Sequence, residues 1–199
     1  MEILIAPMSK SNQVEYPVAE LIEQRRSRRA YSTNPIEHEK IKSLFEAARW
    51  APSSMNEQPW TYVYATRDQP DLWNKLLELL NESNRVWAIN APLLIFSLAR
   101  KTHMRNGANN ALARYDTGAA NTLLSIQATQ LGLNVHQMGG YDRQKAIESL
   151  NIPEAYEPIV IMAIGYPGDP DSLSENLKLR EEAPRERYTQ EFFVMNKSF

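Results

Sequence analysis

The 199-residue chain contains no cysteine and only seven glycines. Without cysteine there are no disulfides, thiolate nucleophiles or cysteine metal sites. The few glycines form neither a Gly-x-Gly-x-x-Gly fingerprint nor a Walker loop, the two usual backbone cradles for a nucleotide phosphate. We therefore expect that any phosphate bound by this protein is held by side chains.

Long apolar runs and a strong excess of one charge are also missing. The longest apolar stretch, 159–164, is far too short to cross a bilayer. The first seven residues lack the basic and apolar regions of a signal peptide. The net charge of −2 is unlike that of a dedicated nucleic-acid binder. We expect a cytoplasmic protein with neither a membrane nor a nucleic-acid partner.

The three histidines do not indicate a metal site. His38, His103 and His136 are scattered along the chain, and none has a second histidine at metal-ligand spacing. No Ser/His/Asp signature or nucleophile elbow is present either. We therefore expect no bound metal, and we name no catalytic acid, base or nucleophile.

One dense cluster of positive charge stands out against this mildly acidic background. The run Arg25-Arg26-Ser27-Arg28-Arg29 brackets a hydroxyl with four guanidiniums, which can fork onto a dianionic phosphate. A nucleic-acid contact or a solvated helix end would also explain such a run. Near the other end of the chain, Arg185-Glu186-Arg187 is either a second clamp on the same phosphate or a solvated tail.

Two further segments carry groups suited to a polar heterocycle. The loop Pro52-Ser53-Ser54-Met55-Asn56-Glu57-Gln58-Pro59 concentrates hydroxyls and amides, although these residues also make a good helix-to-strand turn. Gly139-Gly140 follows a predicted strand, where glycine lets the backbone approach a ligand closely. A plain Gly-Gly turn is the alternative explanation.

The apolar periodicity predicts helices interleaved with strands, and therefore a single α+β or α/β domain over 17–199 preceded by a polar arm over 1–16. The segment 101–110 is polar and reads as a mobile excursion. The predicted helices start at Pro17, run through 41–48, 70–80 and 112–131, and start again at Asp142; the predicted strands are 60–65, 92–99, 134–137 and 158–165.

The order of these features resembles the nitroreductase family of FMN-dependent oxidoreductases, from about Pro17 to Val194. The resemblance implies an α+β three-layer sandwich, in which helices flank a mixed, mostly antiparallel sheet. It also implies an intertwined homodimer with FMN at the subunit interface. The apolar end of the chain, Phe192 to Met195, would then reach across to the partner subunit.

The resemblance also implies which residues bind the cofactor. Those that match the family's phosphate and ribityl contacts are Arg25, Arg26, Ser27 and Arg29, with Arg187 and Arg185 as the C-terminal contact. Those that match the loop contributed by the partner chain are Pro52, Ser53, Ser54 and Asn56. Those that match the turn facing the reactive edge of the flavin are Met138, Gly139 and Gly140. The segment 101–110 falls where family members vary the substrate channel.

The activity implied is ping-pong hydride transfer. NADPH or NADH would reduce the flavin, and a nitroaromatic, quinone or similar acceptor would then reoxidise it, with the protein supplying binding and orientation. One alternative is a family relative with another reaction, such as ring dehydrogenation or flavin fragmentation. A second is a flavin-binding protein without turnover.

Overall fold

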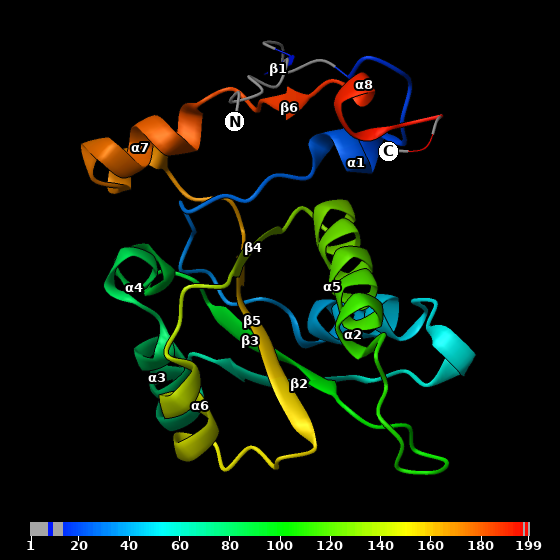
Figure 1. The fold of residues 1–199 in the computed structure, drawn as a ribbon. Coiled ribbons are helices and arrows are strands. Elements are labelled where there is room, and N and C mark those ends of the chain that lie inside the picture. The colour runs from blue at the N-terminus through cyan, green and yellow to red at the C-terminus, as the bar shows by residue number, and fades with distance from the viewer. Residues whose placement is uncertain (1–7, 10–13, 197, 199) are drawn as a thin grey trace, which may run out of the picture.

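A four-stranded sheet forms the centre of the protein in the computed structural model, which describes residues 8–9, 14–196 and 198 (Figure 1). The strand order is β2-β3-β5-β4, and each of these neighbouring pairs is antiparallel. The predicted α+β class is confirmed, with a purely antiparallel sheet in the described chain where we expected a mostly antiparallel one. The strands are β2 (Trp60–Thr66), β3 (Leu93–Arg100), β4 (Asn134–Met138) and β5 (Tyr156–Gly165).

Helices cover both faces of the sheet and give three layers (Figure 1). One face is covered by α2 (His38–Arg49) and α5 (Ala113–Gln130), which also pack against each other. The opposite face is covered by α3 (Pro70–Leu79), α4 (Glu82–Ala88) and α6 (Arg143–Ser149). No helix among the described residues is long and apolar enough to cross a membrane.

Strand β3 explains why two separate cores form. Side chains alternate between the faces of a strand, so Leu93 and Ile95 join the core under α2 and α5, while Leu94, Phe96 and Leu98 join the core under α3, α4 and α6. All eight residues of β3 are buried. The continuous apolar run predicted such a strand, and its slightly shifted bounds leave that prediction confirmed.

The described segments nearest the two termini lie together at one side of the sheet layers (Figure 1). This end contains β1 (Met8–Ser9), α1 (Glu20–Gln24), α7 (Glu175–Glu182), β6 (Arg187–Tyr188) and α8 (Gln190–Phe193). β1 pairs with β6, so part of the predicted N-terminal arm is a short strand. Residues 14–16 of that arm are exposed, and 1–7 and 10–13 lie outside the described residues.

Several boundaries differ from those predicted, for local reasons. Helix α1 begins at Glu20 and not at Pro17. Helices α4 and α7 were not predicted, because α4 is a seven-residue helix and α7 is strongly charged, with Glu181 as its one buried residue. The 101–110 segment forms a compact loop closed by backbone bonds, such as Asn110 N–H to Lys101 O at 2.7 Å.

We expect truncation of a buried leucine to lower the free energy of unfolding far more than truncation of an exposed one. Leu124 on α5 is fully buried, so Leu124→Ala should lower the free energy of unfolding by about 2–5 kcal/mol. Leu179 on α7 is 67% exposed, and Leu179→Ala should stay within about 0.5 kcal/mol of the wild type. Urea unfolding of both variants checks this, and equal losses would contradict the assignment of the core.

Candidate functional site

The arginine cluster is held in place by one buried carboxylate. Glu181 on α7 is 3% exposed, and its carboxylate accepts the backbone N–H of Arg29 at 2.9 Å and of Ala30 at 3.4 Å. The guanidinium of Arg28 donates to the Glu181 carbonyl at 3.0 Å and lies 3.9 Å from the carboxylate. The backbone around the cluster is therefore fixed by a residue about 150 positions away in the sequence.

The C-terminal arginines meet the same segment. Arg185 donates to the carbonyl of Arg25 at 2.9 Å and to that of Glu23 at 2.6 Å. Arg26 donates in the opposite direction, to the carbonyl of Ala183 at 2.7 Å. The structure thus brings together the two arginine groups that lie at opposite ends of the sequence.

Positive charge is concentrated at this junction. Burial lowers the pKa of Arg25, and the nearby guanidiniums of Arg185 and Arg187 lower it further. The pKa of Arg26 is lowered by burial and by Arg28 and Arg185, against an opposing effect of Glu181. Because a bound anion would relieve this repulsion through charge-assisted hydrogen bonds, the arrangement is chemically suited to a phosphate.

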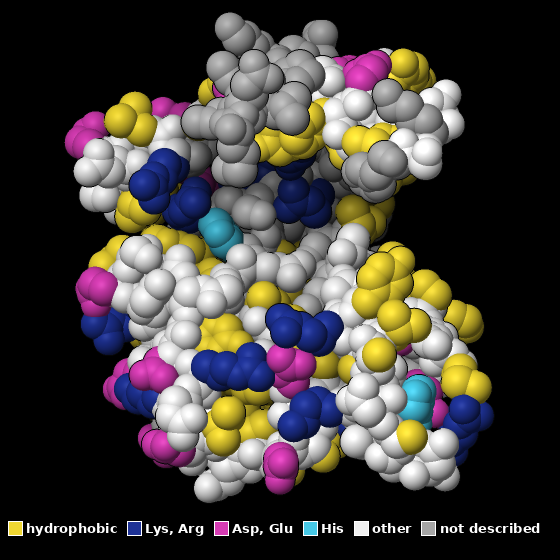
Figure 2. Space-filling model, viewed as in Figure 1, with side chains coloured by type: hydrophobic (Ala, Val, Ile, Leu, Met, Phe, Trp, Pro, Cys, Tyr) yellow, Lys and Arg dark blue, Asp and Glu magenta, His cyan; other side chains and the backbone are white. Residues whose placement is uncertain are grey.

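A small cavity opens beside these charges. It has a volume of about 180 Å³ and is lined by Arg25 and Ser27, by Thr122 and Ser125 of α5, and by Val135 and Gln137 of β4. Figure 2 shows Lys and Arg side chains around the hollow between the α1–α7 end and the rest of the molecule. Ligand pockets commonly measure about 300–1,000 Å³, so this cavity can take a phosphate and its neighbouring groups but not a whole dinucleotide-sized cofactor.

Arg29, which was also predicted to bind the phosphate, does not line this cavity. The guanidinium of Arg29 lies 6.0 Å from the centre of the Trp87 ring, outside the cavity lining. His136 of β4 packs on the same ring at 4.7 Å, and its Nδ1 lies 3.0 Å from the Arg28 carbonyl. The rings of Trp87 and His136 therefore pack against the Arg28–Arg29 part of the arginine cluster.

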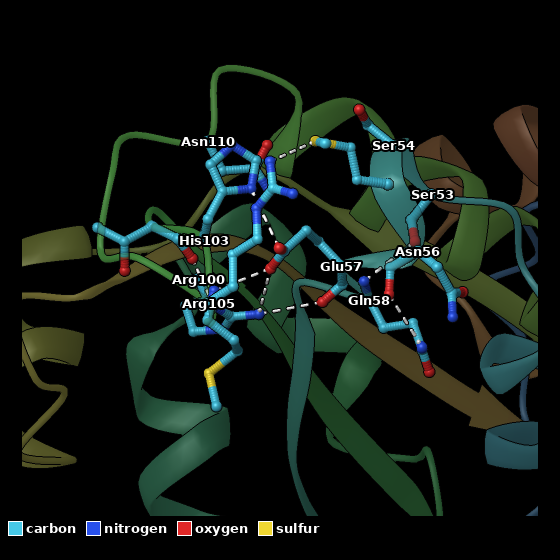
Figure 3. Close-up of polar contacts among 12 residues, drawn as sticks. Ser53, Ser54, Asn56, Glu57, Gln58, Arg100, His103, Arg105 and Asn110 are labelled. Carbon is cyan, nitrogen blue, oxygen red and sulfur yellow. Dashed lines mark hydrogen bonds and ion pairs between the residues drawn. The ribbon is translucent and has the colours of Figure 1, made fainter.

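The predicted loop 52–59 has an unusual backbone conformation. Met55, Asn56 and Gln58 have φ values of 54°, 55° and 45°, which is the left-handed region that non-glycine residues rarely adopt. Ser54 donates its N–H to Asp116 of α5 at 3.1 Å, and Ser53 accepts the Gln58 N–H at 3.0 Å (Figure 3). Such strain persists where surrounding contacts fix it, and it is concentrated at functional sites.

This loop does not reach the arginine cavity of its own chain. Ser54 contacts α5 at Asp116, whereas the cavity contacts α5 at Thr122 and Ser125. With a rise of 1.5 Å per residue, the two places are about 9–14 Å apart along the helix. Pro52, the first residue of the loop, is exposed.

The residues of the predicted turn, Met138, Gly139 and Gly140, have different surroundings. Met138 is 2% exposed and belongs to the core under α3 and α4. Gly140 accepts hydrogen bonds from Asn81 and Asn84, and a Cβ there would lie 2.4 Å from Asn81 Nδ2, so a larger residue would have to displace the Asn81 side chain. A Cβ on Gly139 would meet nothing within 4 Å, which leaves its surroundings open.

Several residues of the site were not predicted. Glu181 resembles its exposed neighbour Glu182, and nothing local in the sequence distinguishes a buried acid from a solvated one. Thr122, Ser125 and Gln137 line the cavity with hydroxyl and amide groups. Ser125 belongs to a set of buried polar residues on α5, and this break in the apolar pattern of a packed helix is a usable signal.

Comparison with known proteins agrees with these features. A profile described as the Nitroreductase family matches residues 22–166. This chain belongs to the nitroreductase family. The resemblance inferred from the motifs is thus confirmed, but α7, β6 and α8 lie beyond the matched residues, so the placement of Arg185 and Arg187 depends on the geometry described above.

Individual relatives cover most of the chain. A protein of Archaeoglobus fulgidus, provisionally named NADH dehydrogenase/NAD(P)H nitroreductase, is 30% identical over 78% of this chain and 88% of its own. The FMN reductase [NAD(P)H] of Bacillus subtilis is 27% identical over 82% and 71%. A crystal structure described as an oxidoreductase containing FMN has a TM-score of 0.89 and 36% identity over 96% of this chain and 97% of that one.

His136 predicts a pH dependence of stability. Burial lowers its pKa from 6.5 to about 4, and the charges of Arg29 and Arg25 act in the same direction. Between pH 6.5 and pH 4 the imidazole is therefore protonated in the unfolded chain but neutral in the native state. The free energy of unfolding should fall by ~3 kcal/mol as the pH drops from 6.5 to 4. Above pH 6.5 this contribution is fully present.

Urea unfolding at several pH values measures this dependence. His136→Gln should flatten the decline between pH 6.5 and 4, while His38→Gln, at an exposed position, should leave it unchanged. An equally steep decline in His136→Gln would contradict the role of this buried imidazole.

Proposed function

We propose that this protein is an FMN-dependent oxidoreductase that uses NADPH or NADH to reduce a small acceptor, such as a nitroaromatic or a quinone, by ping-pong turnover. The observation that carries the proposal is the convergence of Arg25, Arg185 and Arg187 beside a hydroxyl-lined cavity. The chain's family and the FMN or NAD(P)H in the names of its relatives support it.

The residues at the cavity fit a flavin phosphate. Arg25 and Ser27 line it, and Arg187 adds charge to the same place, so these three would contact the phosphate and the adjoining ribityl chain. Arg26 and Arg185 bond to backbone carbonyls and would hold the segment in shape while adding positive potential. Arg29 would act on the phosphate only through that potential, since its guanidinium lies over Trp87.

The remaining parts of the site would come from a second copy of the chain. Tyr115, Gly118 and Thr122 follow one another along an exposed face of α5, between the Asp116 contact of the loop and the arginine cavity. No described atom lies within 4 Å of where a Cβ on Gly118 would stand, so another backbone can approach closely. A homodimer packed on this face would bring the partner's loop of residues 52–56 to the cofactor.

Exposed apolar side chains support the same arrangement. Phe193 and Val194 at the C-terminal end are 64% and 58% exposed, and Tyr115 on α5 is 78% exposed. The consecutive exposed apolar residues at the C-terminal end are typical of an interaction surface. The C-terminal segment from Phe192 to Met195 would pack on the partner subunit.

The chemistry would need no side-chain acid or base. When bound, FMN supplies hydride transfer, and the protein contributes binding, orientation and electrostatics. The open surroundings of Gly139 make its backbone N–H the donor that we place at the reactive edge of the flavin, as backbone donors stabilise developing negative charge elsewhere. Gly140 would shape this turn through its packing on Asn81.

An absorbance spectrum between 300 and 550 nm tests the proposed activity. The purified protein, or protein incubated with FMN, should show flavin bands that bleach on anaerobic addition of NADPH or NADH and return with a quinone. Bands that fail to bleach would favour a flavin-binding protein without turnover. A colourless protein that takes up no FMN would contradict the proposal.

A further inference from the structure

Glu57 is a charged residue of the loop 52–59, yet its side chain is only 7% exposed. Its carboxylate faces the 101–110 segment and not solvent (Figure 3). It accepts the Met104 N–H at 2.9 Å, and His103 Nδ1 lies 3.4 Å from it. A buried carboxylate of this kind is retained only where it is paired and hydrogen-bonded.

Arg100, the last residue of β3, also contacts Glu57. Its guanidinium, 11% exposed, lies 3.5 Å from the Glu57 carboxylate and donates to the carbonyls of both Glu57 and Thr102. The loop and the 101–110 segment are therefore both tied to the end of a fully buried central strand.

The contacts of Glu57 with Arg100, His103 and Met104 fix where the tip of the 101–110 segment lies. The segment is closed by backbone bonds between His103 and Ala108 at 2.8 Å and between Gly107 and His103 at 2.9 Å. From this tip the guanidinium of Arg105 reaches to 3.0 Å from the sulfur of Met55 (Figure 3). Met55 is one of the left-handed residues of the loop that we propose contacts the cofactor.

We propose that Glu57 is a positioning residue that fastens the 101–110 segment over the loop 52–56 and thereby shapes the acceptor side of the flavin site. This inference rests on the proposed function. The Met104 N–H, together with the charges of His103 and Arg100, holds the pKa of Glu57 below its usual range, so the carboxylate remains charged at neutral pH. Without it, Arg100 would lose its counter-charge and Met104 would lose its acceptor.

Two variants separate the parts of this interaction. Glu57→Gln keeps an oxygen that can accept the Met104 N–H but removes the charge, and Glu57→Ala removes both. Glu46→Gln is the matched control, because Glu46 also forms an ion pair, with Arg49, but within one helix and with its side chain 54% exposed. The ion pair between Glu46 and Arg49 joins no two segments that are distant in the sequence.

The first readout is trypsin cleavage of the protein without FMN. Lys101 and Arg105 provide cleavage sites within the segment, and cleavage there follows the population of the opened segment. The initial rate should rise about tenfold in Glu57→Ala and less in Glu57→Gln. The control should match the wild type.

The second readout is steady-state kinetics of the FMN-loaded protein with 1,4-benzoquinone and with 4-nitrobenzoate. The KM for the acceptor should rise about threefold or more in Glu57→Ala, with an intermediate value in Glu57→Gln, while kcat and bound FMN change by less than about twofold. A general loss of structure would instead lower FMN content and kcat together.

The outcomes distinguish this inference from the proposed function. Cleavage rates and KM values that equal those of the wild type in both variants would overturn the inference, as would faster cleavage with an unchanged KM. If Glu57→Ala does not fold, Glu57→Gln alone decides the result by the same criteria. A wild-type protein that binds no FMN would contradict the proposed function and this inference together.

Discussion

The candidate site depends on the buried carboxylate of Glu181. By accepting the backbone N–H groups of Arg29 and Ala30, it joins α7 to the arginine cluster and places Arg185 and Arg187 beside Arg25. Three guanidiniums in one place repel one another, and Glu181 offsets part of the positive charge at Arg26 and Arg28. The folded protein therefore concentrates positive charge here, which a dianionic phosphate would stabilise.

Helix α5 sets the spacing between the parts of the site. One section of the helix contacts the strained loop through Asp116, and a section roughly two turns further on lines the arginine cavity. Its inner face is fixed to the sheet by Leu124 and by Asn121, whose side-chain oxygen accepts the Tyr62 hydroxyl at 3.0 Å. The exposed face between the two sections is where we propose that a second copy of the chain packs, which would bring the partner's loop toward the cavity.

Sequence reasoning succeeded wherever the determining signal was local. The apolar run of β3 and the apolar periodicity over 70–80, where α3 lies, each predicted a structural feature that is confirmed. The arginine cluster was found for the same reason, since charge density is visible along the chain. The order of the motifs predicted the family, which the comparisons confirm.

The features that were missed depend on tertiary burial. Glu57 and Glu181 are ordinary acids in sequence, and only the folded chain shows that each joins two distant segments. Helix α7 has no apolar stripe that periodicity could detect, because its one buried residue is Glu181, which contacts the arginine cluster. Conversely, Gly140 was assigned to the site from sequence, while its contact with Asn81 gives it a packing role that sequence could not show.

The phosphate assignment is tested most directly by comparing FMN with riboflavin, which differ only in the phosphate. Charge-assisted hydrogen bonds contribute about 1.5–3 kcal/mol each, so the wild type should bind FMN about a hundredfold more tightly than riboflavin, by titration of flavin fluorescence. Arg25→Ala should reduce that ratio by about tenfold or more, and Arg49→Ala, in a surface ion pair with Glu46, should preserve it. Equal affinities for the two flavins in the wild type, or an unchanged ratio in Arg25→Ala, would contradict a phosphate site at the arginine cluster.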